Sequence, residues 1–293
     1  MKKFRPILIF ISFLVIVFVI MYYFPVQSEV TEMTILEKRA KMGHAVDEYL
    51  YGRMLILGDF PKEKKQEGLA FLEKAATKEY KPAIIFLAQI YEKGIGGIHR
   101  DYIKAFKWYK KGAQLGIKTA QLKLSPFEEL KKDKNSFILF GIPIKKARRF
   151  SVRYILQKNG AVPIDLNDDS FCDIFSSNNF LPGTDKMQVC YGLDGYFVLL
   201  EYRYPPRRTK YGEILAKNMS KLIKKYGNPK TISKVNVVDY YLWEKDGVNI
   251  YLWMEPKTNT CFLRYVVMNR YLELVNYLMS KKREKEVPKV EFY

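Results

Sequence analysis

Two short runs carry residue types that could do chemistry. Residues 165–169 (DLNDD) bring together three carboxylates, which would suit a hard cation such as Ca²⁺. The run lacks the glycine and the terminal glutamate of an EF-hand loop, so we interpret it as an exposed turn. The run His99-Arg100-Asp101 resembles part of a catalytic set, but the pattern around it favours the start of a helix.

No other combination of residues indicates an enzyme. Neither His44 nor His99 adjoins a serine or cysteine nucleophile, and no G-x-S-x-G occurs. Residues 94–97 are glycine-rich, but no GKS or GKT follows them, so they are not a phosphate loop. Four carboxylates lie near expected strand ends, but the sequence pairs none of them with a second catalytic group: Asp194, Glu201, Glu244 and Glu255. We therefore predict no catalytic residue, cofactor or metal, and keep a hydrolase with an unrecognised site as an alternative.

The cysteines favour a disulfide over a metal or redox site. No CxxC pair occurs among Cys172, Cys190 and Cys261, so structural zinc and thioredoxin-like chemistry have no support. Cys172 and Cys190 lie on consecutive strand-like runs whose pairing could bring them together. If the chain is exported to an oxidising compartment, we predict a Cys172–Cys190 disulfide and a buried Cys261 thiol.

The chain is strongly basic, with 50 Lys and Arg against 31 Asp and Glu and a net charge of +19. Such an excess suits nucleic acid, acidic headgroups or an acidic polymer. No zinc-finger, homeodomain or aromatic ribonucleoprotein motif is present, so we predict no nucleic-acid partner. Lysines are spread along the chain, which favours a generally basic surface and leaves an anionic partner surface as the second interpretation.

One cluster of cations is local. Residues 203–210 (RYPPRRTK) place four cations on a proline-stiffened stretch: Arg203, Arg207, Arg208 and Lys210. Such a basic loop could bind an acidic partner or lipid phosphates. The alternative is an ordinary solvated loop.

An apolar segment, residues 7–24, follows a basic N-terminus. As a helix it would span roughly 27 Å at ~1.5 Å per residue, close to the hydrocarbon thickness of a bilayer. The basic residues before it predict a cytoplasmic N-terminus and an extracytoplasmic bulk. We expect residues 1–28 to be a retained signal-anchor in a bacterial envelope, with the bulk periplasmic in a Gram-negative cell. The alternative is cleavage after Val26-Gln27-Ser28 and secretion.

Residues 45–120 contain an internal repeat with a period in the solenoid range. The end of the second copy, residues 104–113, aligns with residues 67–76 of the first copy. This alignment places Phe71 at the position of Trp108.

The pattern resembles the Sel1-like repeat, a relative of the tetratricopeptide repeat. The second copy matches the family pattern in place at these positions: Tyr91, Gly94, Gly96, Asp101, Lys104, Ala105, Trp108, Lys111 and Ala113. Gly112 departs at an alanine position, and residues 58–61 replace the glycine turn in the first copy. The resemblance covers about a quarter of the chain, and it implies paired helices over residues 29–130 that bind protein partners.

We expect the signature residues to be structural. Three alanines of the second copy are small and let paired helices approach closely: Ala88, Ala105 and Ala113. Tyr91 and Trp108 should fill the remaining interhelical space, and replacing a core Trp108 with Ala should cost about 3–5 kcal/mol. Asp101 stands where a helix N-cap is needed. Since a solenoid usually needs about three repeats, we expect caps from residues 31–51, from a partial third helix over 119–130 and from the C-terminal domain.

After a linker at residues 131–136 the pattern changes to an α+β domain over residues 136–293. A helix is expected over 145–158 and strands over 170–175, 187–191 and 196–204. The order then recurs, with a helix over 211–226, strands over 237–244, 248–255 and 261–268, and a last helix over 270–285. This duplicated helix-strand-strand-strand order is typical of antiparallel sheets with segregated helices. It is weakly similar to the β-lactamase-inhibitor-like and outer-membrane-assembly lipoprotein folds, which are binding modules.

The sequence therefore predicts a membrane-anchored, non-catalytic adaptor or scaffold that binds protein partners through its repeats. The first alternative is an inhibitor-like or ligand-binding protein in which the C-terminal domain does the binding. The second is the hydrolase mentioned above.

Overall fold

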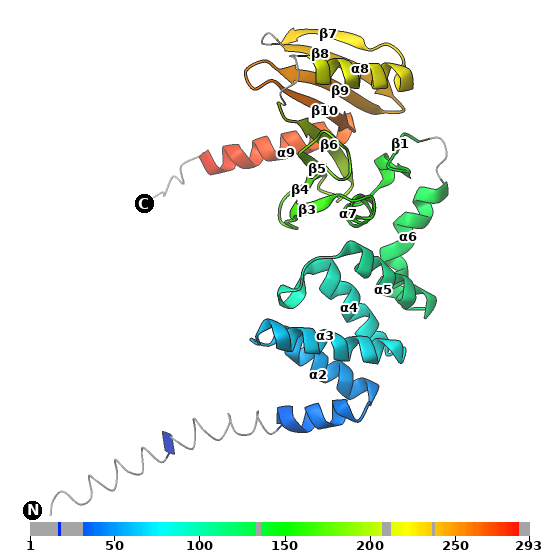
Figure 1. Cartoon of the computed structure of the whole chain (residues 1–293), viewed down its shortest axis with the longest axis vertical. Helices are drawn as coiled ribbons and strands as arrows, with labels where there is room; N and C mark the ends of the chain where they lie inside the picture. The colour runs from blue at the N-terminus through cyan, green and yellow to red at the C-terminus, as the bar shows by residue number, and fades with distance from the viewer. Residues whose placement is uncertain (1–16, 19–31, 133–135, 207–211, 236–237, 287–293) are drawn as a thin grey trace, which may run out of the picture. The chain divides into compact units, whose positions relative to one another are not determined.

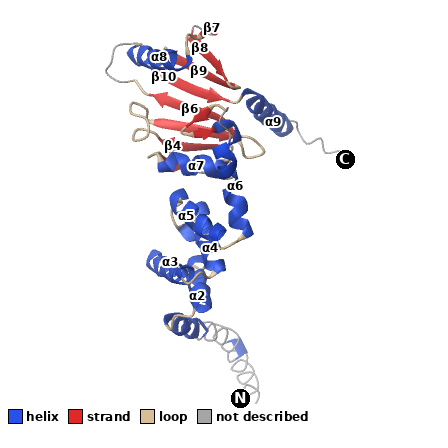
Figure 2. Ribbon diagram, turned by 90° about the vertical axis from the view of Figure 1, so that its right-hand side faces the viewer, coloured by secondary structure: helices blue, strands red, loops and turns tan. Residues whose placement is uncertain are grey.

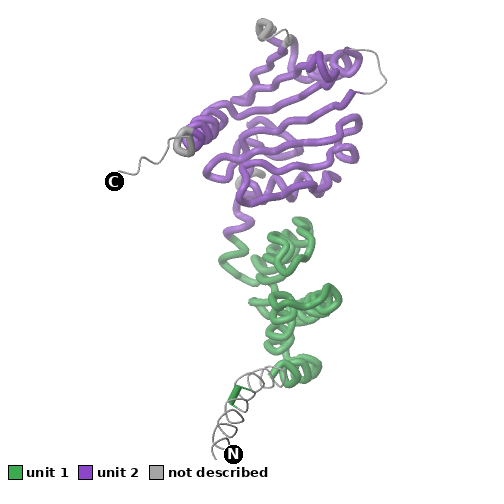
Figure 3. The backbone as a smooth tube through the Cα atoms, turned by 90° about the vertical axis from the view of Figure 1, so that its left-hand side faces the viewer, with its two compact units in different colours: residues 1–121 green, residues 122–293 purple. Residues whose placement is uncertain are grey.

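The structure is a computed structural model that describes residues 17–18, 32–132, 136–206, 212–235 and 238–286. It divides into two compact units, residues 1–121 and residues 122–293 (Figure 3). Apart from residues 17–18, the predicted membrane segment at 7–24 lies outside the described residues. Within the described ranges, no helix is long and apolar enough to cross a membrane.

The first unit is built from helical hairpins (Figure 1). After a helical stretch at residues 32–41, the helices are α2 (Ala45–Leu57), α3 (Lys62–Thr77), α4 (Lys81–Lys93) and α5 (Tyr102–Gln114), with α6 (Lys118–Lys132) continuing into the second unit. A 3-10 turn, Ile95–Gly97, joins α4 to α5. α6 covers the partial third helix that we expected over residues 119–130.

Small residues set the spacing inside each hairpin. Gly52 of α2 lies against Gly68 of α3, and both are buried. In the second hairpin, Ala88 of α4 and Ala105 of α5 are fully buried. Two of the three small residues that we predicted between the helices are therefore buried there, and in the first hairpin glycines take this place.

The second unit is an eight-stranded antiparallel sheet (Figure 2). Its strand order is β3-β4-β5-β6-β10-β9-β8-β7, so β6 and β10 meet at the centre. The strands are β3 (Val162–Asp165), β4 (Cys172–Ser176), β5 (Lys186–Tyr191), β6 (Phe197–Tyr204), β7 (Lys230–Val235), β8 (Val238–Lys245), β9 (Val248–Glu255) and β10 (Thr260–Val266). A short hairpin, β1 (Ile138–Leu139) and β2 (Ile142–Pro143), precedes them.

The duplication is present, but each half holds one strand more than the sequence predicted. The first half runs α7 (Arg149–Lys158) then β3 to β6, and the second runs α8 (Glu213–Tyr226) then β7 to β10. The missed strands, β3 and β7, are the two edges of the sheet. β3 contains Pro163, which a sequence pattern marks as a break and which an edge strand tolerates.

Helices cover the two faces of the sheet unequally. Val152 and Leu156 of α7 and Leu222 of α8 join the main core against one face. On the other face, Leu274 of α9 (Met268–Glu286) packs with Leu199 and neighbouring residues in a smaller cluster. Sequence reasoning placed α7 four residues too early, because residues 144–146 form a 3-10 turn before the helix begins.

Candidate interaction surfaces

The turn between α4 and α5 has the geometry that the repeat signature requires. The Asp101 carboxylate caps α5, since its Oδ1 accepts the backbone N–H of Lys104 at 2.9 Å. Gly94 ends α4 in the left-handed region with φ 74°. Gly96, at φ 69°, leaves no room for a side chain, because a Cβ there would stand 2.5 Å from the carbonyl oxygen of Ile56. The run His99-Arg100-Asp101 is thus a helix start.

Tyrosine–glutamate contacts join neighbouring helices of the repeats. The buried Tyr91 hydroxyl lies 3.4 Å from Glu73 Oε1, and burial together with this carboxylate raises the pKa of Tyr91 to about 12. Tyr109 donates to Glu92 Oε2 at 2.6 Å. Tyr91 is therefore buried between helices, as we predicted. The sequence pattern did not indicate its hydrogen-bond partner, Glu73.

Trp108 does not have the core position that we predicted. The buried side of α5 consists of Tyr102, Ala105, Tyr109 and Gly112, at helical spacings of three and four residues. Trp108 lies beside this buried stripe and is half-buried, and the Lys111 ammonium is 5.8 Å from the centre of the Trp108 ring. Ala113 is also half-buried. A Cβ on Gly112 would stand 3.1 Å from the Cβ of Ala120, which explains the departure from alanine there.

α2 and the start of α4 present an aromatic and aliphatic face. The Tyr49 ring lies 5.4 Å from that of Tyr80 and 6.2 Å from that of Phe86. Beside this cluster, Val46 is 49% exposed and Leu50 is 41% exposed. We call these five residues the repeat face. Large exposed apolar side chains that gather with aromatics are typical of interaction sites.

A second surface lies on the face of the sheet that carries α9. Tyr240 of β8, Trp253 of β9 and Phe262 of β10 are direct cross-strand partners. Their ring centres are 5.6 Å apart for Tyr240–Trp253 and 5.0 Å apart for Trp253–Phe262. All three side chains are half-buried. We call this row the aromatic ladder.

Arginine–carboxylate pairs continue the surface beside the ladder. Arg264 lies 5.0 Å from the Trp253 ring centre and donates to Glu201 Oε2 at 2.7 Å. Arg203, the cross-strand partner of Phe262, donates to Asp185 Oδ1 at 3.0 Å. Although partial burial opposes it, the Arg203 guanidinium lowers the pKa of Asp185. Arginine and aromatic side chains are the residues enriched at protein interfaces.

The position of Arg203 in the structure differs from the one predicted for it in a basic loop. Arg203 belongs to β6 and is paired with Asp185, so it is a strand residue rather than a free loop cation. Its partners in the prediction, Arg207, Arg208 and Lys210, lie outside the described residues. The sequence pattern missed the pairing because Asp185 is separated from Arg203 by a strand and a turn.

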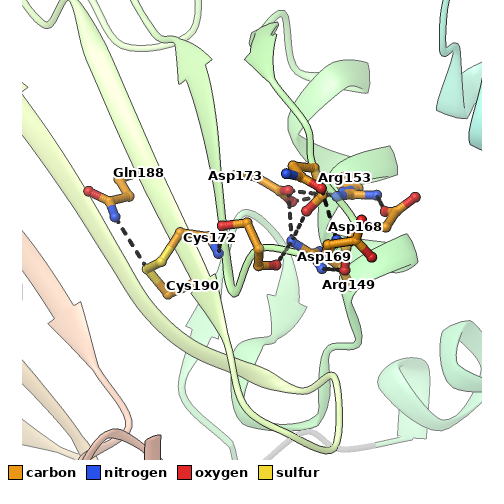
Figure 4. A network of polar contacts seen from close by, with 10 residues as sticks. Arg149, Arg153, Asp168, Asp169, Cys172, Asp173, Gln188 and Cys190 are labelled. Carbon is orange, nitrogen blue, oxygen red and sulfur yellow. Dashed lines mark hydrogen bonds and ion pairs between the residues drawn. A yellow bond between two sulfur atoms is a disulfide. The ribbon is translucent and has the colours of Figure 1, made fainter. Parts of the chain in front are cut away.

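The acidic run at residues 165–169 faces arginines (Figure 4). Arg149 donates to the carbonyl oxygens of Asn167, Asp168 and Ser170 at 3.0, 3.2 and 2.6 Å. Arg153 donates to Asp168 Oδ1 at 2.6 Å. The cation held at this loop is therefore guanidinium, and none of the described residues forms a group of His, Cys, Asp or Glu suited to a metal.

At the centre of this network Asp173 is fully buried. Arg153 clamps it with two bonds, at 2.8 Å to Oδ2 and 2.6 Å to Oδ1, and Arg149 adds a third at 3.1 Å (Figure 4). The network ties α7 to β4 and to the loop before it. Since every carboxylate oxygen is engaged by a guanidinium, this arrangement fixes structure and leaves no general acid or base.

The cysteines divide between the two faces of the sheet. Cys172 and Cys190 are opposed on β4 and β5 and form a disulfide bridge, on the side of the cluster that includes Leu274 of α9. Cys261 is a buried free thiol in the main core. Burial raises the pKa of Cys261 to about 11, although a hydrogen bond with Asn218 acts to lower this pKa. The thiol therefore stays protonated and unreactive at neutral pH.

Three of the four carboxylates that we weighed for catalysis have structural partners. Glu201 pairs with Arg264, and Glu244 receives a bond from Lys230 at 2.6 Å. Asp194 Oδ1 accepts the backbone N–H of Tyr196 at 3.0 Å inside the β5–β6 turn. None of these three is poised beside a nucleophile.

Comparisons with known proteins identify the helical segments. The Sel1 repeat family model matches residues 41–80 and 81–117, so the chain carries two Sel1 repeats that cover about a quarter of it. Residues 41–51, which we expected to belong to a cap over residues 31–51, are thus part of the first repeat. A search of curated proteins finds no match.

Solved structures give partial matches. A protective antigen of uropathogenic Escherichia coli with an SLR fold matches at 23% identity over 43% of this chain, with a TM-score of 0.30, and the match spans 26% of the antigen. A Sel1 repeat protein from Oxalobacter formigenes matches at 24% identity over 42% of this chain and 84% of its own, with a TM-score of 0.29. A DUF4309 family protein from Bacillus subtilis matches at 13% identity over 44% of this chain and 87% of its own, with a TM-score of 0.29.

Proposed function

We propose that this protein is a membrane-anchored adaptor that binds protein partners through the repeat face. Sel1 repeats generally mediate protein–protein interaction, and two of them are present. The observation that carries the proposal is the repeat face itself. Tyr49, Val46 and Leu50 lie together on α2, with the two aliphatic side chains close to half exposed. No catalytic arrangement competes with binding among the described side chains.

The partner that fits the repeat face is an apolar polypeptide segment. Burying an exposed aliphatic side chain gains roughly 1.5–3 kcal/mol, and aromatic rings add contact area at small entropic cost. Lys81 is exposed at the start of α4, while Glu48 of α2 is buried and accepts a hydrogen bond from Lys78 at 2.6 Å. Apolar contact would therefore supply most of the affinity, with charge at the rim.

The anchoring half of the proposal comes from the apolar segment at residues 7–24 and the basic residues before it. Insertion would leave the N-terminus cytoplasmic and the residues after the apolar segment extracytoplasmic. A chain anchored in this way should stay in the membrane fraction after high-salt and alkaline washing. A mature protein that begins at Glu29 would show cleavage and overturn the anchor.

Photo-crosslinking in the native host tests the binding half. A photoreactive amino acid at Leu50 should give discrete crosslinked bands that mass spectrometry identifies as one or a few proteins. Ile103 is the matched control, because it is 45% exposed on α5 and is equally aliphatic. Identical bands from both positions, or none from Leu50, would contradict binding by the repeat face.

The second candidate function is partner binding by the C-terminal sheet, and the aromatic ladder with its flanking arginines favours it. Trp253 and Arg264 are of the residue types that dominate binding energy at interfaces. A photoreactive group at Gln188, exposed on the same face of the sheet, should then crosslink a partner. The same group at Lys224, exposed on α8, should not. Bands at Gln188 without bands at Leu50 would assign binding to the sheet.

A further inference from the structure

A cavity of about 170 Å³ opens beside α8 in the second unit. Its wall is formed by one side of that helix, by the end of β6 and by the turn at Gly183. The residues that matter for its chemistry are Tyr204, Glu213, Lys217, Asn218 and Lys221. On α8 these positions follow one another at intervals of one helical turn, so they form a single stripe.

The cavity contains buried polar side chains. Tyr204 and Asn218 are each only 6% exposed. Asn218 is hydrogen-bonded to the Cys261 thiol beneath it. Tyr204 contributes its phenol ring and hydroxyl group to the lining of the cavity. A phenol hydroxyl and a side-chain amide in the lining of a cavity can both donate hydrogen bonds to a bound group.

Two ammonium groups stand beside these donors. Lys217 and Lys221 are exposed, and neither has an ion-pair partner in the described part of the chain. They lie one turn apart, so they would act on the same bound group. Glu213 lies one turn before Lys217, and it would repel a negative charge placed at that end.

We propose that this cavity binds a small molecule through an anionic oxygen group, a carboxylate or a phosphate, placed between Lys217 and Lys221. The Tyr204 hydroxyl donates to the same group or to an oxygen beside it. Donors outnumber acceptors in this cavity, which selects anions over cations. The volume of about 170 Å³ suits a group the size of a small metabolite.

Nothing about the cavity indicates a reaction. The Cys261 thiol stays protonated because burial raises its pKa to about 11, so it is not a nucleophile. Burial also keeps the pKa of Tyr204 above its usual value, so the phenol is a donor at neutral pH. The site is therefore a binding site, independent of the repeat face.

Isothermal titration calorimetry of the full chain tests this site, with inorganic phosphate in one series and succinate in another. We expect one saturable site per chain for at least one probe, with a Kd on the order of 1 mM. Binding of phosphate alone assigns a phosphate ligand, and binding of succinate alone assigns a carboxylate ligand. The double variant Lys217→Gln/Lys221→Gln should weaken binding at least about tenfold, and Tyr204→Phe about threefold or more.

The control variant is Lys224→Gln/Lys225→Gln, which removes the same charge from exposed positions of the same helix. It should bind like the native chain. An equal loss of binding in both double variants would show only a general attraction to a basic surface, and it would contradict the proposed site. Absence of saturable binding by either probe would also overturn it. Thermal midpoints of the two lysine double variants should agree with that of the native chain, since the four lysines are exposed.

Discussion

The carbonyl oxygen of Gly68 lies 2.7 Å from the point where a Cβ on Gly52 would stand, and the Gly52 carbonyl lies 2.9 Å from a Cβ on Gly68. The two helices of the first repeat thus meet backbone to backbone. In the second repeat Ala105, aligned with Gly68, is also buried at the crossing. The first repeat has glycine at this position because a Cβ on Gly68 would stand 2.9 Å from the Gly52 carbonyl oxygen and from Leu55 Cβ.

Gly52→Ala should therefore destabilise the first repeat, even though alanine is the better helix former. Overpacking of this kind costs roughly 1–3 kcal/mol, more than the about 1 kcal/mol gained in helix propensity. Hydrogen exchange of peptides from α2 and α3 measures the effect locally. Arg53→Ala, at the neighbouring exposed position, should leave exchange unchanged. Slower hydrogen exchange in α2 and α3 of Gly52→Ala would contradict this prediction, because it would show that the two helices accommodate the methyl group without losing stability.

Phe71→Ala should cost more stability than Trp108→Ala, although the two residues hold aligned positions. Phe71 is 7% exposed, and its ring lies 5.0 Å from the Tyr51 ring in an edge contact. Truncation of such a core aromatic costs about 3–5 kcal/mol. Trp108 is half-buried, so we expect about 1–2 kcal/mol there. Thermal unfolding of both variants gives the comparison. A larger decrease in thermal midpoint for Trp108→Ala would show that Trp108 is a core residue.

The sequence predicted elements well where one property alternates along the chain. In β9, Ile250, Leu252 and Met254 face the main core while Tyr251 and Trp253 lie on the opposite face of the sheet, and the strand has the predicted bounds. It predicted the repeat turn because Gly94 and Asp101 have roles that few other residues can take. Both signals are local, since each depends on the backbone geometry of a few neighbouring residues.

The candidate surfaces could not be predicted, because they depend on register between distant segments. The aromatic ladder takes one residue from each of three strands, and it exists only because Tyr240, Trp253 and Phe262 are opposed. Arg153 and Asp173 are twenty residues apart and meet through tertiary packing. Trp108 was misplaced because the family pattern records residue types, while burial depends on the rotation of α5.

Asp173→Asn should destabilise the C-terminal unit strongly. The change leaves the buried Arg153 guanidinium without its main counter-charge, and breaking a buried pair costs about 3–5 kcal/mol. Asp169→Asn, exposed in the adjacent loop, removes the same charge and should have little effect. Urea unfolding followed by tryptophan fluorescence distinguishes the two. Equal midpoints for both variants would show that the network is dispensable.

Thiol counting tests the disulfide and its isolation from Cys261. The native chain should show no reactive thiol, because Cys172 and Cys190 are bridged and Cys261 is buried. In denaturant without reductant one thiol should react, and Cys261→Ser should abolish that signal. The free thiol and the bridge belong to clusters on opposite faces of the sheet, so they should not exchange in the folded protein. Three reactive thiols in denaturant would rule the bridge out.

The repeats should lose stability at alkaline pH through their buried tyrosines. Burial, with Glu67 and Glu37 adding to it, raises the pKa of Tyr51 to about 12, and burial with Glu73 raises that of Tyr91 to about 12. In the unfolded chain both phenols ionise near pH 10. Between pH 10 and 12 the unfolded state releases protons that the folded state keeps, so the free energy of unfolding falls as pH rises. Below pH 10 the contribution is fully present.

Tyr91→Phe isolates this effect, because phenylalanine keeps the ring and removes the ionisable hydroxyl. The lost contact with the exposed Glu73 is long, at 3.4 Å, so stability at neutral pH should change little. Helical circular dichroism of the native chain should decline between pH 10 and 12, and the midpoint of the Tyr91→Phe variant should lie at higher pH. Lysine deprotonation occurs in both proteins and cancels in the comparison. Identical midpoints would mean that the Tyr91 phenolate forms without unfolding the hairpin, and that the buried hydroxyl has access to water.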